Sequence, residues 1–157
     1  MPEKTAEERA IVLPDWPQPA VVAEPRICAD DSSLLLRYRT GDEKIVVVRF
    51  PLCNYLALGA PNDEALGGHP LYSRGLKHYS VHEVVHSSLM KLLERRNSVH
   101  PRHDPESYLR DKKHYVFTFQ DSTLECVVSE GEWWKPTGKV CDSESEAEEE
   151  WRRSGDA

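Results

Sequence analysis

The sequence lacks the long apolar segments and closely spaced cysteines that mark several large classes of protein. It contains no run of about eighteen apolar residues, so we expect no transmembrane helix. The N-terminal segment MPEKTAEERA is charged and has no apolar core, which argues against a secretory signal. The cysteines are widely separated, without a CxxC pair: Cys28, Cys53, Cys126 and Cys141. This spacing excludes a zinc ribbon and favours reduced thiols in a cytoplasmic protein.

Signals for nucleotide and nucleic-acid binding are also missing. The chain has no GK[ST] phosphate-binding loop and no RNA-binding signature. The net charge is −7, which disfavours nucleic acid as a partner. Basic residues that a nucleic acid would contact are Arg95, Arg96, Arg102, Lys112 and Lys113. We therefore expect neither a membrane nor a nucleic acid to be the main partner.

The charge is unevenly distributed along the chain. Residues 142–157 contain seven acidic and two basic residues and so carry a charge of −5. Residues 72–115 contain nine basic and five acidic residues and carry a charge of +4. This asymmetry indicates a polyanion site or an internal contact with the acidic tail, and it is also typical of a solvated basic face.

Length and patterning predict one α+β domain. Ser33–Arg39 and Lys44–Phe50 are apolar, β-branched segments around a polar turn, which predicts a β-hairpin. Tyr115–Gln120 and Thr123–Val128 form a second hairpin of the same kind, and Leu52–Leu58 continues as an extended segment. We predict an antiparallel sheet of four to five strands with one long helix packed on one face.

The two ends of the chain differ in composition from this domain. Residues 1–26 form a Pro-rich arm, disordered at its start, with Trp16 docked on the domain. Residues 27–138 form the α+β domain. Residues 139–157 contain the acidic run SESEAEEEW, which predicts a disordered tail because it cannot bury a core.

The long helix is predicted over Ser80–Asn97. Ser80 and Glu83 have the spacing of a capping box, in which the serine hydroxyl and the glutamate each satisfy a backbone N–H of the first turn. Apolar residues then recur at helical spacing, and Arg95 and Arg96 suit the negative end of the helix dipole.

This segment contains the motif His82-Glu83-Val84-Val85-His86. On a helix, HExxH places two imidazoles one turn apart, and in these five residues the chain resembles the zincin metallopeptidases. The resemblance implies that His82 and His86 bind Zn²⁺ and that Glu83 acts as the general base. The pattern does not continue, since Leu92 stands where a metzincin has its third histidine; Glu106 is an alternative third ligand. The competing interpretation is that Glu83 is only a helix cap.

A second candidate site lies in the loop Gly59–Leu71. Its residues Asn62, Asp63, Glu64 and His69 suit hydrogen bonding, acid–base catalysis or binding of a hard metal ion. Asp63, Glu64 and His69 are the candidate catalytic residues, and Asn62 and His69 are candidates for ligand binding together with His78 and Arg74. All seven histidines lie between His69 and His114, and a loop folded over Ser80 would bring His69, His78, His82 and His86 together.

Three classes of function follow. The first is a small intracellular, non-catalytic binding or regulatory domain that acts through contacts with a partner protein and needs no cofactor. The second is a zinc-dependent hydrolase built on the HExxH motif. The third is an enzyme for a small-molecule ligand that uses the Asn62–His69 loop and the histidine cluster.

Overall fold

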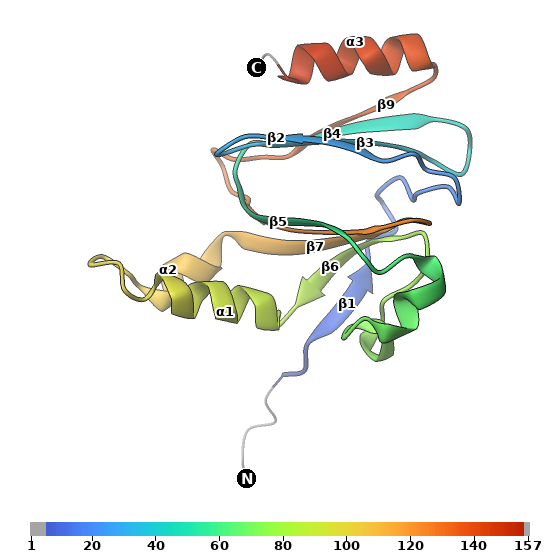
Figure 1. The fold of residues 1–157 in the computed structure, drawn as a ribbon. Helices are drawn as coiled ribbons and strands as arrows, with labels where there is room; N and C mark the ends of the chain where they lie inside the picture. Colours follow the sequence, from blue (N-terminus) through green and yellow to red (C-terminus); the bar gives the residue numbers. More distant parts are fainter. Residues whose placement is uncertain (1–5, 156–157) are drawn as a thin grey trace.

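Two antiparallel β-sheets packed face to face form the centre of the molecule (Figure 1). The computed structural model describes residues 6–155. The first sheet has the strand order β1-β6-β7-β8-β5, with β1 (Arg9–Val12), β6 (Val81–Val85), β7 (Lys112–Thr118), β8 (Thr123–Ser129) and β5 (Cys53–Gly59). The second sheet has the order β2-β3-β4-β9, with β2 (Arg26–Ala29), β3 (Leu34–Arg39), β4 (Ile45–Phe50) and β9 (Thr137–Cys141).

Three α-helices and two short 3₁₀ helices complete the fold. The 3₁₀ helices η1 (Asp63–Gly68) and η2 (Tyr72–Arg74) lie on the outer side of the five-stranded sheet, and α1 (Ser88–Asn97) contacts α2 (Pro105–Arg110) beside it. Helix α3 (Glu144–Gly155) packs on the outer face of the four-stranded sheet. The α+β class and the antiparallel pairing are confirmed, with the strands divided between two sheets.

The core lies between the sheets and follows the strand alternation. Tyr115, Phe117, Leu124 and Cys126 point inward from β7 and β8, and Tyr38 does so from β3. The other buried members of this cluster are Ala23, Leu34, Leu36, Val46, Val48, Phe50, Val81, Phe119 and Val128. Residues between these positions on β6, β7 and β8 therefore face the outer side, beneath η1 and η2.

Both expected hairpins are present. Strands β3 and β4 pair from Leu34↔Phe50 to Arg39↔Ile45, and β7 and β8 pair from Lys112↔Ser129 to Thr118↔Thr123. The extended segment after Pro51 is β5, and it pairs with β8 rather than with β4. Local turn chemistry therefore located these strands correctly.

The helix expected over Ser80–Asn97 is wrong in its first half. Val81–Val85 is strand β6, which pairs with β1 on one side and β7 on the other. Ser80 does not cap a helix: its hydroxyl donates to the carbonyl oxygen of His78 at 2.8 Å, and its N–H donates to the Thr118 hydroxyl. The chain turns at His86, which has a φ of 52°, and α1 begins with Ser87 as its N-cap, accepting from the N–H of Met90 at 3.1 Å. The pairing of Val81–Val85 with strands on both sides therefore outweighed the local helix signal of this segment.

The Pro-rich arm belongs to the folded core. Strand β1 pairs with β6, and Pro19 forms a β-bridge with Thr40. Trp16 packs against the central core, with its ring centroid 6.2 Å from Phe50 and 5.3 Å from Tyr115. The docking expected of Trp16 is thus confirmed. The disorder expected at the start of the arm falls on residues 1–5, outside the described part of the chain.

The acidic tail is not disordered over its described residues, up to Gly155. It forms the end of β9 and the helix α3, whose Ala147 and Trp151 pack over Leu35, Ile45 and Val47. Apolar residues four positions apart supply the buried stripe that the acidic composition concealed.

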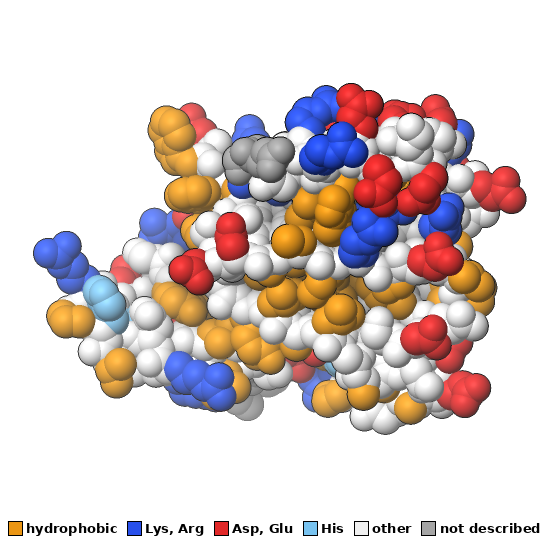
Figure 2. All heavy atoms as spheres, turned by 45° about the horizontal axis from the view of Figure 1, so that its top comes forward, with side chains coloured by type: hydrophobic (Ala, Val, Ile, Leu, Met, Phe, Trp, Pro, Cys, Tyr) orange, Lys and Arg blue, Asp and Glu red, His pale blue; other side chains and the backbone are white. Residues whose placement is uncertain are grey.

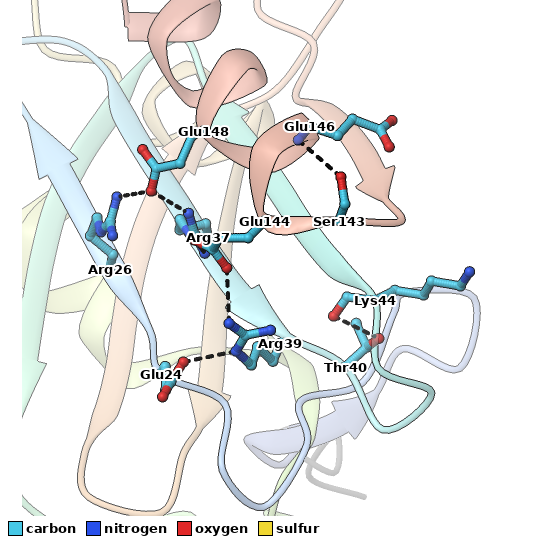
Figure 3. Close-up of polar contacts among 10 residues, drawn as sticks. All are labelled: Glu24, Arg26, Arg37, Arg39, Thr40, Lys44, Ser143, Glu144, Glu146 and Glu148. Carbon is cyan, nitrogen blue, oxygen red and sulfur yellow. Dashed lines mark hydrogen bonds and ion pairs between the residues drawn. The ribbon is translucent and has the colours of Figure 1, made fainter.

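Arginine side chains on the sheet hold the acidic face of α3 (Figure 3). Arg37, whose side chain is only 6% exposed, contacts Glu144 at 2.6 Å and Glu148 at 2.9 Å. Arg26 also contacts Glu148, and Arg39 contacts Glu144. The acidic segment therefore has an internal contact, but with β2 and β3 rather than with residues 72–115.

Charged side chains of both signs gather over the α3 end of the molecule, and hydrophobic side chains form a band below it on the face drawn in Figure 2. The helices within residues 6–155 include none that is long and apolar enough to cross a membrane.

Candidate functional site

The HExxH motif does not lie on a helix, so its two histidines lack the one-turn spacing of a zincin site. On strand β6 the side chains alternate, so His82 and Glu83 point to opposite faces of the sheet, and His86 lies beyond the strand on the surface. Glu83 lies 3.8 Å from the ammonium group of Lys113. Among the described residues, no group of three or more His, Cys, Asp or Glu side chains is arranged to hold a metal ion.

His82 is a fully buried side chain with both ring nitrogens in hydrogen bonds. Its Nδ1 atom is 3.1 Å from the carbonyl oxygen of Val116, and its Nε2 atom is 3.0 Å from the N–H of Lys77. A carbonyl only accepts and an N–H only donates, so this geometry requires the neutral Nδ1–H tautomer. Burial lowers the pKa of His82, which also favours the neutral form. The side chain therefore joins the segment that follows η2 to the sheet and has no free lone pair for a ligand.

A second set of polar groups meets on the outer face of the five-stranded sheet. The Nε2 atom of His114 lies 3.2 Å from a carboxylate oxygen of Glu125, and that of His69 lies 3.5 Å from the same oxygen. On its other side, the Nδ1 atom of His114 is 2.7 Å from the hydroxyl of Ser87. Since the Nδ1 atom of His69 accepts from the N–H of Leu71, its Nε2–H is the group that faces Glu125.

Glu125 is ionised in this environment. Burial raises its pKa, but the hydrogen bonds and charges of His114 and His69 outweigh burial and lower the pKa to about 2. Ser87, His114 and Glu125 share the residue types of a catalytic triad, but the carboxylate binds Nε2 and the serine binds Nδ1, the reverse of the usual order. Ser87 is also buried and caps α1. The arrangement ties α1, η1 and the sheet together.

The loop residues proposed for catalysis and ligand binding are engaged in local structure. Asn62 is the N-cap of η1 and accepts from the N–H of Ala65 at 3.0 Å. The carboxylate of Asp63 accepts from the Tyr79 hydroxyl at 2.5 Å, and its carbonyl oxygen is 3.1 Å from Nε2 of His78. These contacts fix the segment over the sheet.

The remaining loop candidates lie apart from one another. Glu64 and Arg74 are exposed on η1 and η2. His69 and His82 share the outer face of the sheet, as expected of a loop that folds over the HExxH segment, whereas His78 and His86 lie on the surface. The four histidines do not converge on one point.

A different feature forms the best candidate for a binding surface: an apolar cleft along the open side of the two sheets. One hollow of about 240 Å³ lies between Trp16 and strand β9, above Val46 and Val48 of β4. A second hollow of about 420 Å³ adjoins it, sharing Asp15, Trp16, Pro17 and Val140. Val140 is 50% exposed at the rim.

Strand β9 runs along this cleft as a free edge. It is the last strand of its sheet and pairs only with β4, in a register that places Val140 opposite Val46 and Gly138 opposite Val48. Within residues 6–155, no backbone hydrogen bond from another segment reaches its outer side. The loop before β9 also exposes two aromatic side chains, Trp133 at 84% and Trp134 at 45%. An unpaired strand therefore borders an apolar hollow. No protein-family model, curated protein or solved structure matches this chain.

Sequence reasoning missed both the polar network and the cleft. The β7–β8 hairpin register contained a signal for the first, because it places His114 and Glu125 on the same face, diagonally across two strands. The cleft depends on the pairing of β9 with β4, two segments about ninety residues apart in the chain. No local sequence pattern predicts that pairing.

Proposed function

We propose that this protein is an intracellular, non-catalytic binding domain that captures an extended segment of a partner protein. The segment adds as a strand to the free edge of β9 and places an apolar side chain in the cleft beside Trp16. The observation that carries the proposal is the coincidence of an unpaired edge strand with an apolar hollow along its length. In strand addition, main-chain hydrogen bonds provide affinity and side-chain pockets provide specificity.

The edge of β9 lacks the usual protection against pairing. Natural edge strands are guarded by lysine, proline, a bulge or a covering segment. β9 contains no proline, and its pairing with β4 is regular. Its only charged residue, Lys139, is directed to α3, with its ammonium group 3.6 Å from Glu146 and 3.7 Å from Glu150. The edge is thus left available for a partner strand.

The alternative functions receive less support from the same geometry. A zinc-dependent hydrolase needs His82 as a ligand, and both nitrogens of His82 are bonded to backbone groups. An enzyme built on the Asn62–His69 loop needs free polar groups, and Asn62 and Asp63 are engaged in local hydrogen bonds. The four cysteines are free thiols, which supports an intracellular location.

The test uses Gly138, whose missing side chain keeps the cleft open. A Cβ atom at this position meets the Val47 carbonyl oxygen at 3.9 Å and Val48 Cγ2 at 4.0 Å, which are ordinary contacts. Gly138→Val should therefore fill the cleft without disturbing the fold, and a β-branched residue suits a strand. Gly59→Val is the matched control, since Gly59 lies on the edge strand β5 of the other sheet with no atom within 4 Å of its Cβ position.

Peptides selected on the wild-type protein from a random phage-displayed library provide the ligand. We expect them to contain alternating apolar residues, to protect the β9 amides from hydrogen exchange, and to bind Gly138→Val roughly tenfold more weakly or worse. Gly59→Val should bind as the wild type does. Equal binding to Gly138→Val, or protection that appears elsewhere and not in β9, would contradict the proposal.

A further inference from the structure

A separate cavity lies at the other end of the fold from the cleft beside Trp16 and shares no lining residue with it. It has a volume of about 390 Å³ and opens between the end of β6, the start of β7, and helices α1 and α2. Its apolar wall is formed by Val84, Val85, Met90 and Leu109. This volume falls within the range of small-molecule sites, which combine apolar walls with a few polar groups.

The charged groups of this cavity are mainly cationic. Lys91, Lys112 and Lys113 line it, against one carboxylate, that of Glu83. Lys113 is already shared between carboxylates, 3.2 Å from Glu130 and 3.8 Å from Glu83. Lys91 and Lys112 are the two lysines that remain to give the cavity a preference for an anionic ligand.

Neither of these two lysines is paired with a carboxylate. The ammonium group of Lys112 donates to the carbonyl oxygen of Tyr108 at 2.7 Å and lies 3.8 Å from the centre of the Tyr108 ring. Burial lowers the pKa of Lys112, an effect that a bound anion would oppose. The side chain of Lys91 makes no hydrogen bond or ion pair within the described residues and is exposed at the rim.

The N-terminus of α1 is not the anion site. The N–H of Ser88 donates to the carboxylate of Glu8 at 2.5 Å, and the N–H of Met90 donates to the Ser87 hydroxyl. These contacts already engage two of the free N–H groups in the first turn, and the Glu8 carboxylate places a negative charge at this end of the helix. The attraction for an anion therefore comes from the lysine side chains.

We propose that this cavity binds a small amphiphilic anion, with a carboxylate, phosphate or sulfonate group held by Lys91 and Lys112 and an apolar body against Val85, Met90 and Leu109. A partly desolvated ammonium group that forms no ion pair, although the charge of the neighbouring Asp111 acts on it, favours an anion over a neutral ligand of the same shape. The apolar wall favours an anion that carries a hydrocarbon or aromatic portion over a free inorganic ion.

The probe for this site is octanoate, titrated by calorimetry and by backbone amide chemical shifts. Octanol and octyltrimethylammonium carry the same chain with no charge and with the opposite charge. We expect saturable binding of octanoate with shifts confined to β6, α1, α2 and the start of β7, and much weaker binding of the other two compounds. Inorganic phosphate tests whether the head group alone is sufficient, and we expect it to bind more weakly than octanoate.

Lys112→Met keeps the aliphatic stem and removes the charge, and it should weaken octanoate binding roughly tenfold. Lys91→Met, at an exposed position, should also weaken binding and keeps the test valid if the first variant does not fold. Lys77→Met changes an exposed lysine outside the cavity and should have no effect. The proposal is overturned if octanoate shows no saturable binding, if octanol binds as tightly, or if all three variants behave alike.

Discussion

The Nε2 atom of His114 lies 3.2 Å from a carboxylate oxygen of Glu125, although neither residue belongs to a motif that the sequence makes visible. His114 extends this contact to Ser87 at the start of α1, and His69 adds a second imidazole from the end of η1. One carboxylate thus connects three separate segments on the outer face of the five-stranded sheet, and its ionisation should be measurable as a dependence of stability on pH.

The first prediction concerns that dependence. The pKa of Glu125 is about 2 in the folded protein against an ordinary value of 4.5, so ionised Glu125 contributes stability that is complete above about pH 4.5. This contribution is lost as the pH falls toward 2. By linkage it amounts to about 3 kcal/mol at neutral pH. Urea unfolding of Glu125→Gln should therefore show a lower free energy of unfolding at pH 7 and a shallower decline between pH 4.5 and 2.

Glu64→Gln is the control for this prediction, because Glu64 is an exposed carboxylate on η1. Its pH profile should match that of the wild type. Parallel profiles for wild type and Glu125→Gln would mean that the His114 and His69 contacts do not stabilise the ionised carboxylate.

The second prediction separates the two histidines of the HExxH motif. His82→Ala should destabilise the protein by about 2–4 kcal/mol, because it leaves a cavity and removes the partner of the buried Val116 carbonyl and of the Lys77 N–H. His86→Ala should change the free energy of unfolding by less than about 0.5 kcal/mol, since His86 is exposed. Chemical denaturation followed by circular dichroism measures both effects. A zinc site would behave differently: both variants would lose zinc affinity together, and the wild-type protein would be stabilised by added zinc.

The third prediction concerns the tryptophan of the N-terminal arm. Trp16 contacts the rings of Phe50, Tyr115 and Phe117, so Trp16→Ala should cost about 3 kcal/mol. Trp133→Ala is matched in chemistry but removes a side chain that is 84% exposed, and its stability should be that of the wild type. A Trp16→Ala variant that is as stable as the wild type would indicate that the arm does not hold its place in the core.

The fourth prediction concerns the docking of α3. Cys141 is buried beneath this helix, whereas Cys126 is buried in the central core, so the two thiols report local and global opening respectively. Arg37→Met removes the contacts to Glu144 and Glu148 and should weaken docking by about 1–2 kcal/mol. Labelling of Cys141 by a thiol reagent should then be roughly tenfold faster.

Labelling is measured in a Cys28→Ser/Cys53→Ser background, so that only the two buried thiols react. Raising the salt concentration should accelerate labelling of Cys141 in the parent, because ions screen the partly exposed glutamates. The rate at Cys126 should be unaffected by Arg37→Met. Equal rates at both thiols in every variant would show that α3 detaches only when the whole protein unfolds.

Local chemistry was sufficient to predict part of this fold. The hairpins β3–β4 and β7–β8 each place apolar segments on both sides of a polar turn, and both register and turn are determined within a few residues. Helix α2 also follows a local rule, since its first residue is Pro105 and proline favours the first turn of a helix.

The errors arose where distant pairing or packing decides the structure. Ser80 and Glu83 have capping-box spacing, but Val81–Val85 is held between β1 and β7, so the helix starts at the next suitable serine, Ser87. The candidate zinc site was inferred from that helix, and the strand removes the one-turn spacing of His82 and His86 on which the inference rested. No local signal identifies β1 as the partner of β6.

The sequence of the acidic tail contained signals of a helix, which its high content of acidic residues obscured. The N–H of Glu146 donates to the Ser143 hydroxyl, and the Glu146 carboxylate accepts from the N–H of Asp142, one residue before the one that a capping box engages. Ala147 and Trp151 then lie four residues apart on the buried side, and Glu144 and Glu148 lie four apart beside the arginines. Periodicity was a better guide to α3 than its charge.

The pairing of β5 with β8 bears on how the chain is made. Leu56 pairs with Cys126, and β6, α1, α2 and β7 are all synthesised between them. During translation the edge of β5 that pairs with β8 therefore remains without its partner until most of the polypeptide has been synthesised. The five-stranded sheet can therefore be completed only after β8 has been synthesised. Nascent chains that stall before residue 129 should consequently depend on chaperones far more than completed ones do.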